Sequence, residues 1–264
     1  MTEWLHIQKG TAPLLVAIPH AGTVVPPVYA GRIDRVLASI DTDWHVDRLY
    51  DFAERLGASI ISTDIARCVI DVNRDPSGAS LYPGLATTEL CPTTDFDGAP
   101  LYAPGDSPGA ADIAKRRSLY FEPYHTAIAS ELARLRTDHP RVVLYDAHSI
   151  RSTVPRLFDG ILPHFNIGCV GGTSCAPELA AAVSHICATT SLDYVLNGRF
   201  KGGWTTRHYG RPDTGIHAIQ MELSQRLYLD EARPKNWDPA LAASIAPILA
   251  AILTACLDFT KGQP

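Results

Sequence analysis

Apolar and polar positions along the chain predict strands that end in chemically useful side chains. "PLLVAIPH" (residues 13–20) and "RVVLYDAHS" (residues 141–149) are short apolar runs typical of buried strands, and each reaches a histidine near its end. "IHAIQMEL" (residues 216–223) alternates instead. One face carries Ile219, Met221 and Leu223, and the other carries Ala218, Gln220 and Glu222. "ASIIST" (58–63) and "RCVIDVNR" (67–74) predict two further strands.

Segments with helical periodicity separate these strands. In residues 41–56 the apolar positions fit a helix, with Asp41 or Asp43 placed to cap its start and Gly57 to end it. The pattern also predicts helices at residues 112–137, 175–189 and 239–257, a long loop at 81–108 and an irregular Gly-rich stretch at 197–210. Strands alternating with helices predict an α/β protein. We expect three αβα layers around a mixed, mostly parallel sheet, in a single domain of residues 1–264.

Composition narrows the choice of partners and compartment. The net charge of −5 and the pI near 6.0 argue against nucleic acid or an anionic membrane as partner, because both favour a basic surface. Six scattered cysteines without a CxxC pair favour reduced thiols and a cytoplasmic protein. No secretory signal pattern is visible, and "IAPILAAILTACL" (245–257) is too short for a membrane span, so we interpret it as a buried helix.

The strand ends carry the candidate metal ligands. Functional groups gather beyond the carboxyl ends of strands in such sheets, and His20 and His148 both lie there. Two imidazoles could hold Zn²⁺ with a third ligand taken from Asp41, Asp43, His45 or Asp47. Instead of binding a metal, each strand-end histidine could be a satisfied core or surface residue, and the aspartates could cap the helix.

Other polar residues suit catalysis and substrate binding. Glu222 could act as a general base if it faces inward, or could lie in solvent on an edge strand. Two or three arginines around one cleft could bind carboxylates, although scattered arginines are more often surface residues. The candidates at turns or strand ends are Arg67, Arg74, Arg151, Arg199 and Arg207. Asp146 shares a strand face with His148, and either orients that imidazole or caps the buried strand.

Longer blocks carry a family resemblance. "PHAG", "DTDWHVDRLYDFAERLGA", "VIDVNR", "DAHSIRS", "LNGRFKGGWTTRHYG" and "HAIQMELSQRLY" resemble the N-formylglutamate amidohydrolase family, in the same order, over about residues 10–230. The resemblance implies a zinc-carboxypeptidase-like (phosphorylase/hydrolase-like) fold. It also implies metal binding by His20 and His148, substrate binding by Asn73 with Arg74, and Glu222 as the base. Where those peptidases have a glutamate ligand this chain has Thr23, so Asp43 is the expected third ligand and His45 the alternative.

The resemblance also implies an activity. We expect one divalent metal ion, Zn²⁺, and hydrolysis of N-formyl-L-glutamate to formate and L-glutamate, as in histidine degradation. Arg67, Arg151 or Arg207 would help Arg74 to bind the carboxylates of this small N-acyl acidic amino acid. Two alternatives stay open, an amidohydrolase for another N-acyl amino acid and a non-catalytic binding protein for an acidic amino acid. The oligomeric state and the native metal also stay open.

Overall fold

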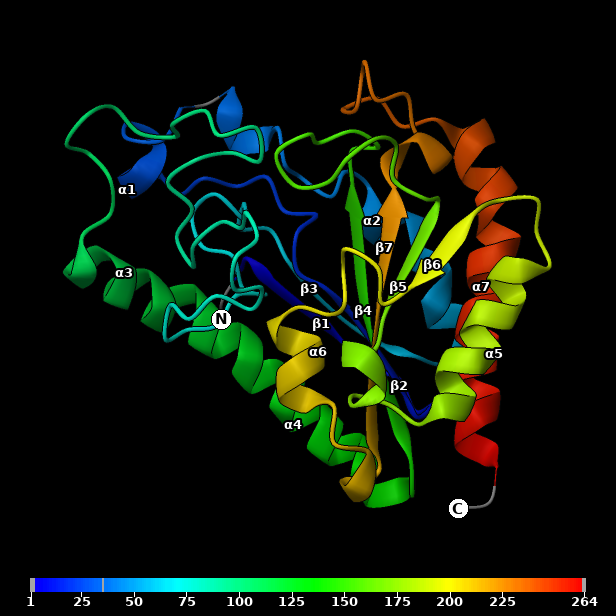
Figure 1. Cartoon of the computed structure of the whole chain (residues 1–264). Helices are drawn as coiled ribbons and strands as arrows, with labels where there is room; N and C mark the ends of the chain where they lie inside the picture. Colours follow the sequence, from blue (N-terminus) through cyan, green and yellow to red (C-terminus); the bar gives the residue numbers. More distant parts are fainter. Residues whose placement is uncertain (1–2, 35, 263–264) are drawn as a thin grey trace.

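The computed structural model describes residues 3–34 and 36–262, and a seven-stranded mixed sheet forms the centre of that part (Figure 1). Its strands are β1 (Leu5–Gln8), β2 (Leu14–Ile18), β3 (Ser59–Thr63), β4 (Val142–Ile150), β5 (Phe165–Gly168), β6 (Tyr194–Leu196) and β7 (Ile216–Ser224). They lie in the order β1-β3-β2-β4-β7-β5-β6. β2 pairs in parallel with β3 and β4, β4 with β7, and β5 with β6, whereas β1–β3 and β5–β7 are antiparallel.

Helices cover both faces of the sheet. They are α1 (Pro27–Ala30), α2 (Val46–Leu49), α3 (Ala110–Arg116), α4 (Glu122–Asp138), α5 (Pro177–Ala188), α6 (Trp204–Tyr209) and α7 (Pro239–Lys261). A π-helical turn, Arg117–Phe121, joins α3 to α4, and short 3₁₀ helices occupy Leu37–Ser39, Asp51–Leu56, Val170–Gly172, Pro212–Thr214 and Gln225–Leu227. In Figure 1, α3 and α4 lie on one side of the sheet and α5 and α7 on the other.

Two hydrophobic cores account for this arrangement, one on each side of the sheet. Val16, Tyr145 and Ile219 face α5 and α7, whereas Leu15, Leu144 and Ala218 face α4. All nine residues of β4 are buried, as expected of a central strand with both faces covered. The predicted three-layer α/β fold with a mixed, mostly parallel sheet is confirmed.

Residues 41–56 differ from the predicted single helix. Only Val46–Leu49 is α-helical, and a 3₁₀ helix follows at Asp51–Leu56 and ends at Gly57, which has a left-handed φ of 73°. His45 precedes α2 with a left-handed φ of 61°, and no side chain caps the helix. The backbone N–H of Asp43 donates to the carbonyl of His20 instead, at 3.0 Å. The segment before α2 is therefore a loop fastened to the end of β2, and the predicted aspartate cap is wrong.

Three further predictions of local structure need correction. Residues 67–73 are buried, but residues 67–74 form turns rather than a strand, because the Asp71 carboxylate accepts from the backbone N–H of Asn73 at 2.9 Å. The stretch 197–210 contains α6, and the helix predicted to end at residue 257 continues to Lys261. The pattern also missed the short strands β1, β5 and β6.

The last helix, α7, is long and apolar enough by length and composition to cross a membrane. Its buried positions pack in the core beside α5: Ala242, Ile245, Leu249, Ile252, Leu253 and Cys256. Small or polar side chains such as Ala243, Ser244 and Thr254 occupy exposed positions. The helix thus has one face in the core. At 23 residues it is longer than the segment 245–257, so the prediction that this segment is too short for a membrane span is wrong. The six cysteines are buried free thiols.

Candidate metal centre

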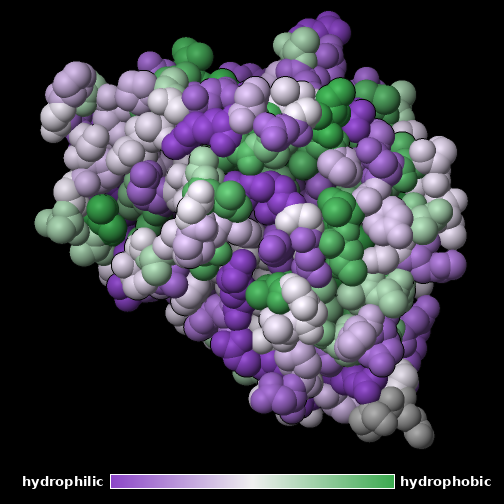
Figure 2. Space-filling model, viewed as in Figure 1, coloured by the Kyte–Doolittle hydropathy of each residue, from purple (hydrophilic) through white to green (hydrophobic). Residues whose placement is uncertain are grey.

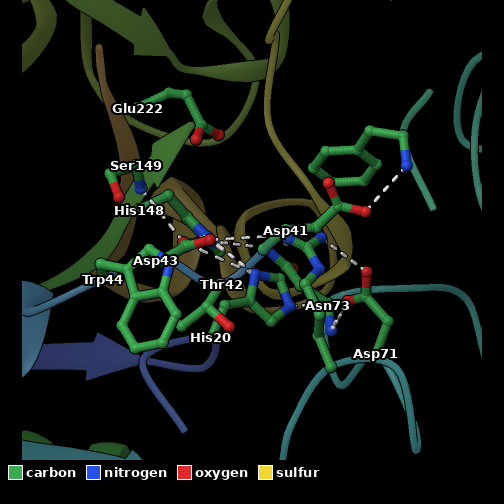
Figure 3. Close-up of polar contacts among 12 residues, drawn as sticks. His20, Asp41, Thr42, Asp43, Trp44, Asp71, Asn73, His148, Ser149 and Glu222 are labelled. Atoms are coloured by element: carbon green, nitrogen blue, oxygen red, sulfur yellow. Dashed lines mark hydrogen bonds and ion pairs between the residues drawn. The ribbon is translucent and has the colours of Figure 1, made fainter. Parts of the chain in front are cut away.

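Three buried side chains from distant segments converge at the carboxyl ends of β2 and β4 (Figure 3). His20 follows β2, His148 lies near the end of β4, and Asp43 comes from the loop before α2. The Nδ1 atoms of His20 and His148 are 3.2 Å apart. The Asp43 Oδ2 atom is 3.2 Å from the His148 Nδ1 atom and 3.7 Å from the His20 Nδ1 atom.

These separations fit a shared cation. A Zn²⁺ ion bound tetrahedrally at about 2.0–2.1 Å has ligand atoms about 3.3 Å apart, which is close to the three distances observed. Two imidazole nitrogens and a carboxylate oxygen are also the donor types that Zn²⁺ takes. Two Nδ1 lone pairs at van der Waals distance repel each other unless a proton or a cation lies between them. His20, Asp43 and His148 could therefore hold a metal ion.

The far nitrogen of each imidazole faces a buried carboxylate. His20 Nε2 lies 2.7 Å from Asp71 Oδ1, and His148 Nε2 lies 3.1 Å from Asp146 Oδ1. Asn73 extends this outer layer, because its Nδ2 atom donates to Asp146 Oδ2 at 3.0 Å and lies 2.8 Å from His148 Nε2. Carboxylates behind metal-binding histidines fix the tautomer and the ring orientation. This arrangement suits ligation through Nδ1 of His20, whose Nε2 atom contacts the Asp71 carboxylate, whereas His148 Nε2 lies between the Asp146 carboxylate and the Asn73 amide.

Electrostatics hold the carboxylate of Asp43 ionised. Burial alone would raise the pKa of Asp43, but hydrogen bonds with His148 and His20 and the nearby charge of Arg67 place that pKa below its usual value. Arg67 donates to both Asp43 Oδ1 and Asp71 Oδ2, at 3.2 and 2.8 Å. The guanidinium therefore neutralises two buried acids and ties the loop before α2 to the turn that carries Asp71.

Glu222 stands beside the ligand group without a bond to it. In the β4–β7 register it is the partner of His148, and in Figure 3 no dashed line joins it to the three ligand side chains. Burial raises the pKa of Glu222 to about 8, against the lowering effect of His148. Its side chain receives one long hydrogen bond, from Gln220 Nε2 at 3.4 Å. A buried carboxyl group with a pKa near neutral pH, next to a candidate metal centre, can both take up and release a proton, as general acid–base catalysis requires.

A cleft opens over this group at the carboxyl ends of the strands. Its lining includes His20, His148, Glu222 and three arginines, Arg67, Arg74 and Arg199. Figure 2 shows hydrophilic residues gathered near the centre of this face, bordered by hydrophobic ones on the side of β5 and β6.

The structure separates the sequence candidates into two groups. Asn73, Arg74 and Arg67 lie in the cleft, although Arg67 is already bonded to Asp43 and Asp71. Arg151 pairs with Asp41 and Asp97 outside the cleft lining, and Arg207 donates to the carbonyl of Gly202. His45, the alternative third ligand, lies 3.1 Å from the carbonyl of Pro234 and packs against Trp237, outside the ligand group.

Sequence reasoning did not propose Asp71 as a member of the site and did not distinguish Arg199 from the other candidate arginines. Asp71 was part of the quoted block "VIDVNR", but its partner His20 is 51 residues away and nothing local marks the contact. Arg199 was one of five turn arginines, and no pattern separated it from Arg151 or Arg207. Both positions became visible only when the fold brought distant segments together.

The fold and the site define a class, α/β proteins with a candidate metal centre at the carboxyl edge of a mixed sheet. Residues 12–229 match the family model for N-formylglutamate amidohydrolase. The chain is 47% identical over 259 residues to N-formylglutamate deformylase of Pseudomonas aeruginosa, and 44% identical to that of Pseudomonas putida, with 97% of both chains covered in each comparison. It therefore belongs to the N-formylglutamate amidohydrolase family, which confirms the resemblance.

A solved structure supports the fold independently. The crystal structure of N-formylglutamate amidohydrolase from Ralstonia eutropha matches with a TM-score of 0.80 at 22% identity, covering 98% of this chain and 97% of that one. At 22% identity this match supports the fold and not the function.

Proposed function

We propose that this chain is a metal-dependent deformylase that hydrolyses N-formyl-L-glutamate to formate and L-glutamate. The observation that carries the proposal is the buried His20–Asp43–His148 group beside the weakly bonded carboxylate of Glu222. The names of the two Pseudomonas relatives support the choice of substrate. The proposed ion is one Zn²⁺ per chain. When bound, such an ion supplies Lewis acidity that polarises the formyl carbonyl and acidifies water.

The chain's own residues then have defined tasks. Glu222 takes a proton from water as the water oxygen attacks the formyl carbon, and passes that proton to the amide nitrogen as the C–N bond breaks. Asp71 and Asp146 keep the two imidazoles oriented. Arg74, which lines the cleft next to Asn73, binds a substrate carboxylate. The products are formate and the free amine of L-glutamate.

We further propose a place for this activity in the cell. Release of L-glutamate from its N-formyl derivative fits the last step of a histidine degradation route. The buried free thiols support a reducing compartment such as the cytoplasm.

The substitution Glu222→Gln tests the proposal, because it keeps the shape of the side chain and removes the base. We expect kcat for N-formyl-L-glutamate to fall by roughly 10²–10⁴-fold while metal content and substrate affinity stay near wild type. Glu54→Gln, at an exposed position of the 3₁₀ helix, is the matched control and should leave kcat unchanged. Wild-type kcat in Glu222→Gln would refute the role of Glu222. Tight binding without hydrolysis in the unaltered chain would favour a binding protein.

A further inference from the structure

One cation in the cleft has no assigned task. Arg199 lies in the segment after β6 and lines the cleft together with Arg74 and Glu222. Its Nε atom donates to the carbonyl of Leu157 at 2.6 Å and its Nη2 atom to the carbonyl of Ala86 at 2.8 Å. Both acceptors are neutral, so the charge of the guanidinium is not balanced by them.

The other cleft arginines differ in this respect. Arg67 pairs with Asp43 and Asp71, and Arg74 lies 3.6 Å from Asp71. No carboxylate within the described residues forms an ion pair with Arg199. Burial lowers the pKa of Arg199. Tyr82 and Glu222 oppose this effect, but the like charge of Arg74 adds to it, so the two cations are close enough to repel each other. A ligand with negative charge between them would relieve the repulsion.

Arg199 is also held in place before any ligand arrives. Its guanidinium carbon lies 5.3 Å from the centre of the Tyr82 ring, and that of Arg207 lies 5.2 Å from the same centre. The Tyr82 hydroxyl donates to the carbonyl of Gly202 and accepts from the N–H of Lys201. A cation fixed by stacking and by two carbonyls binds an anion with little further loss of side-chain entropy.

We propose that Arg199 binds the side-chain carboxylate of the substrate and so selects N-formyl-L-glutamate over neutral N-formyl amino acids. This inference rests on the proposed function. The α-carboxylate is attached to the carbon next to the reacting nitrogen, so it falls to Arg74, which adjoins Asn73 and Asp71 behind the metal ligands. The side chain extends away from the reacting bond toward the wall formed by Leu157, Ala86 and Arg199. Two carboxylates are thus matched by two cations.

The test compares N-formyl-L-glutamate with its neutral isostere N-formyl-L-glutamine in the unaltered enzyme and in Arg199→Gln. We expect Arg199→Gln to lower kcat/KM for the glutamate substrate by about 10²-fold and that for the glutamine substrate by less than about threefold. Arg74→Gln should lower both. The control is Arg156→Gln, an exposed arginine that donates to the carbonyl of Asp95 and lies outside the cleft lining, and it should change neither.

Equilibrium binding of both compounds to Glu222→Gln and to the double variant Glu222→Gln/Arg199→Gln separates this proposal from the function itself. If the unaltered chain hydrolyses neither compound, the proposed function fails. Loss of glutamate-selective binding in the double variant would still support Arg199. Equal losses for both substrates on Arg199→Gln, in a variant with wild-type unfolding temperature, would overturn the assignment, and so would unchanged selectivity.

Discussion

Asp71 is a sharp test of how the metal centre is built, because it touches His20 but is not a candidate ligand. The substitution Asp71→Asn keeps the shape of the side chain and removes its charge. Asp71 Oδ1 lies 2.7 Å from His20 Nε2, and both side chains are at most 2% exposed, so water cannot take over the contact. Loss of such a partner typically weakens metal affinity 10–100-fold. With no solvent compensation we expect about 100-fold, or about 2.7 kcal/mol.

The assay is a zinc titration in competition with a chromophoric chelator, with kcat measured separately at saturating metal. The control is Asp64→Asn, which removes a surface carboxylate that contacts an imidazole at a similar distance. Asp64 lies 2.8 Å from His6, and these side chains are 46% and 55% exposed. It should leave zinc affinity unchanged. Zinc affinity in Asp71→Asn within twofold of wild type would show that the carboxylate behind His20 does not support the site.

Two further predictions concern the surroundings of Asn73. A Cβ atom at Gly203 would lie 2.5 Å from Asn73 Nδ2, so Gly203→Ala should displace that amide and lower kcat/KM roughly 10²-fold. The control is Gly109→Ala, where the added Cβ atom has no atom within 4 Å and kcat/KM should not change. Equal kcat/KM values for the two variants would refute the steric argument. Burial lowers the pKa of His125, whose Nε2 atom contacts the carbonyl of Val72, to about 4. Folding lowers this pKa from 6.5, so the free energy of unfolding has its full value above pH 6.5 as far as His125 is concerned. It falls by about 3 kcal/mol as the pH drops to 4 and the unfolded state takes up the proton. Urea unfolding of the metal-free protein should show that the unfolding free energy of His125→Gln falls less between pH 6.5 and 4 than that of wild type. The same pH dependence in both proteins would contradict a role of His125 in the acid sensitivity.

Local patterns were enough for the parts of the fold that depend on burial. β4 and β7 have sequences that match their positions. The apolar start of β4 suits a central strand, and the alternating run of β7 separates a core face from a cleft face. His20, His148 and Asp43 were predicted as ligands, and the structure brings them within 4.8 Å of one another. The position of the two histidines could be predicted because the carboxyl ends of parallel strands lie at the same edge of a sheet.

The errors occurred where tertiary contacts override local preference. Residues 41–45 contain good capping aspartates, yet the Asp43 carboxylate accepts from the N–H of Ser149 and contacts His148 instead of capping α2. Residues 67–74 are apolar enough for a strand, but Arg67, Asp71 and Asn73 bond to side chains of the centre and fold the segment into turns. Contacts with residues far away in the sequence help decide both segments, such as His20–Asp71 at 51 positions and Ser149–Asp43 at 106 positions.

The most direct test of the proposed chemistry measures metal content and L-glutamate release on the same purified sample, before and after chelation. We expect about one divalent ion per chain, loss of N-formyl-L-glutamate hydrolysis when that ion is removed, and recovery of hydrolysis when Zn²⁺ is returned. Full activity in protein stripped of all metal would contradict the metal centre formed by His20, Asp43 and His148.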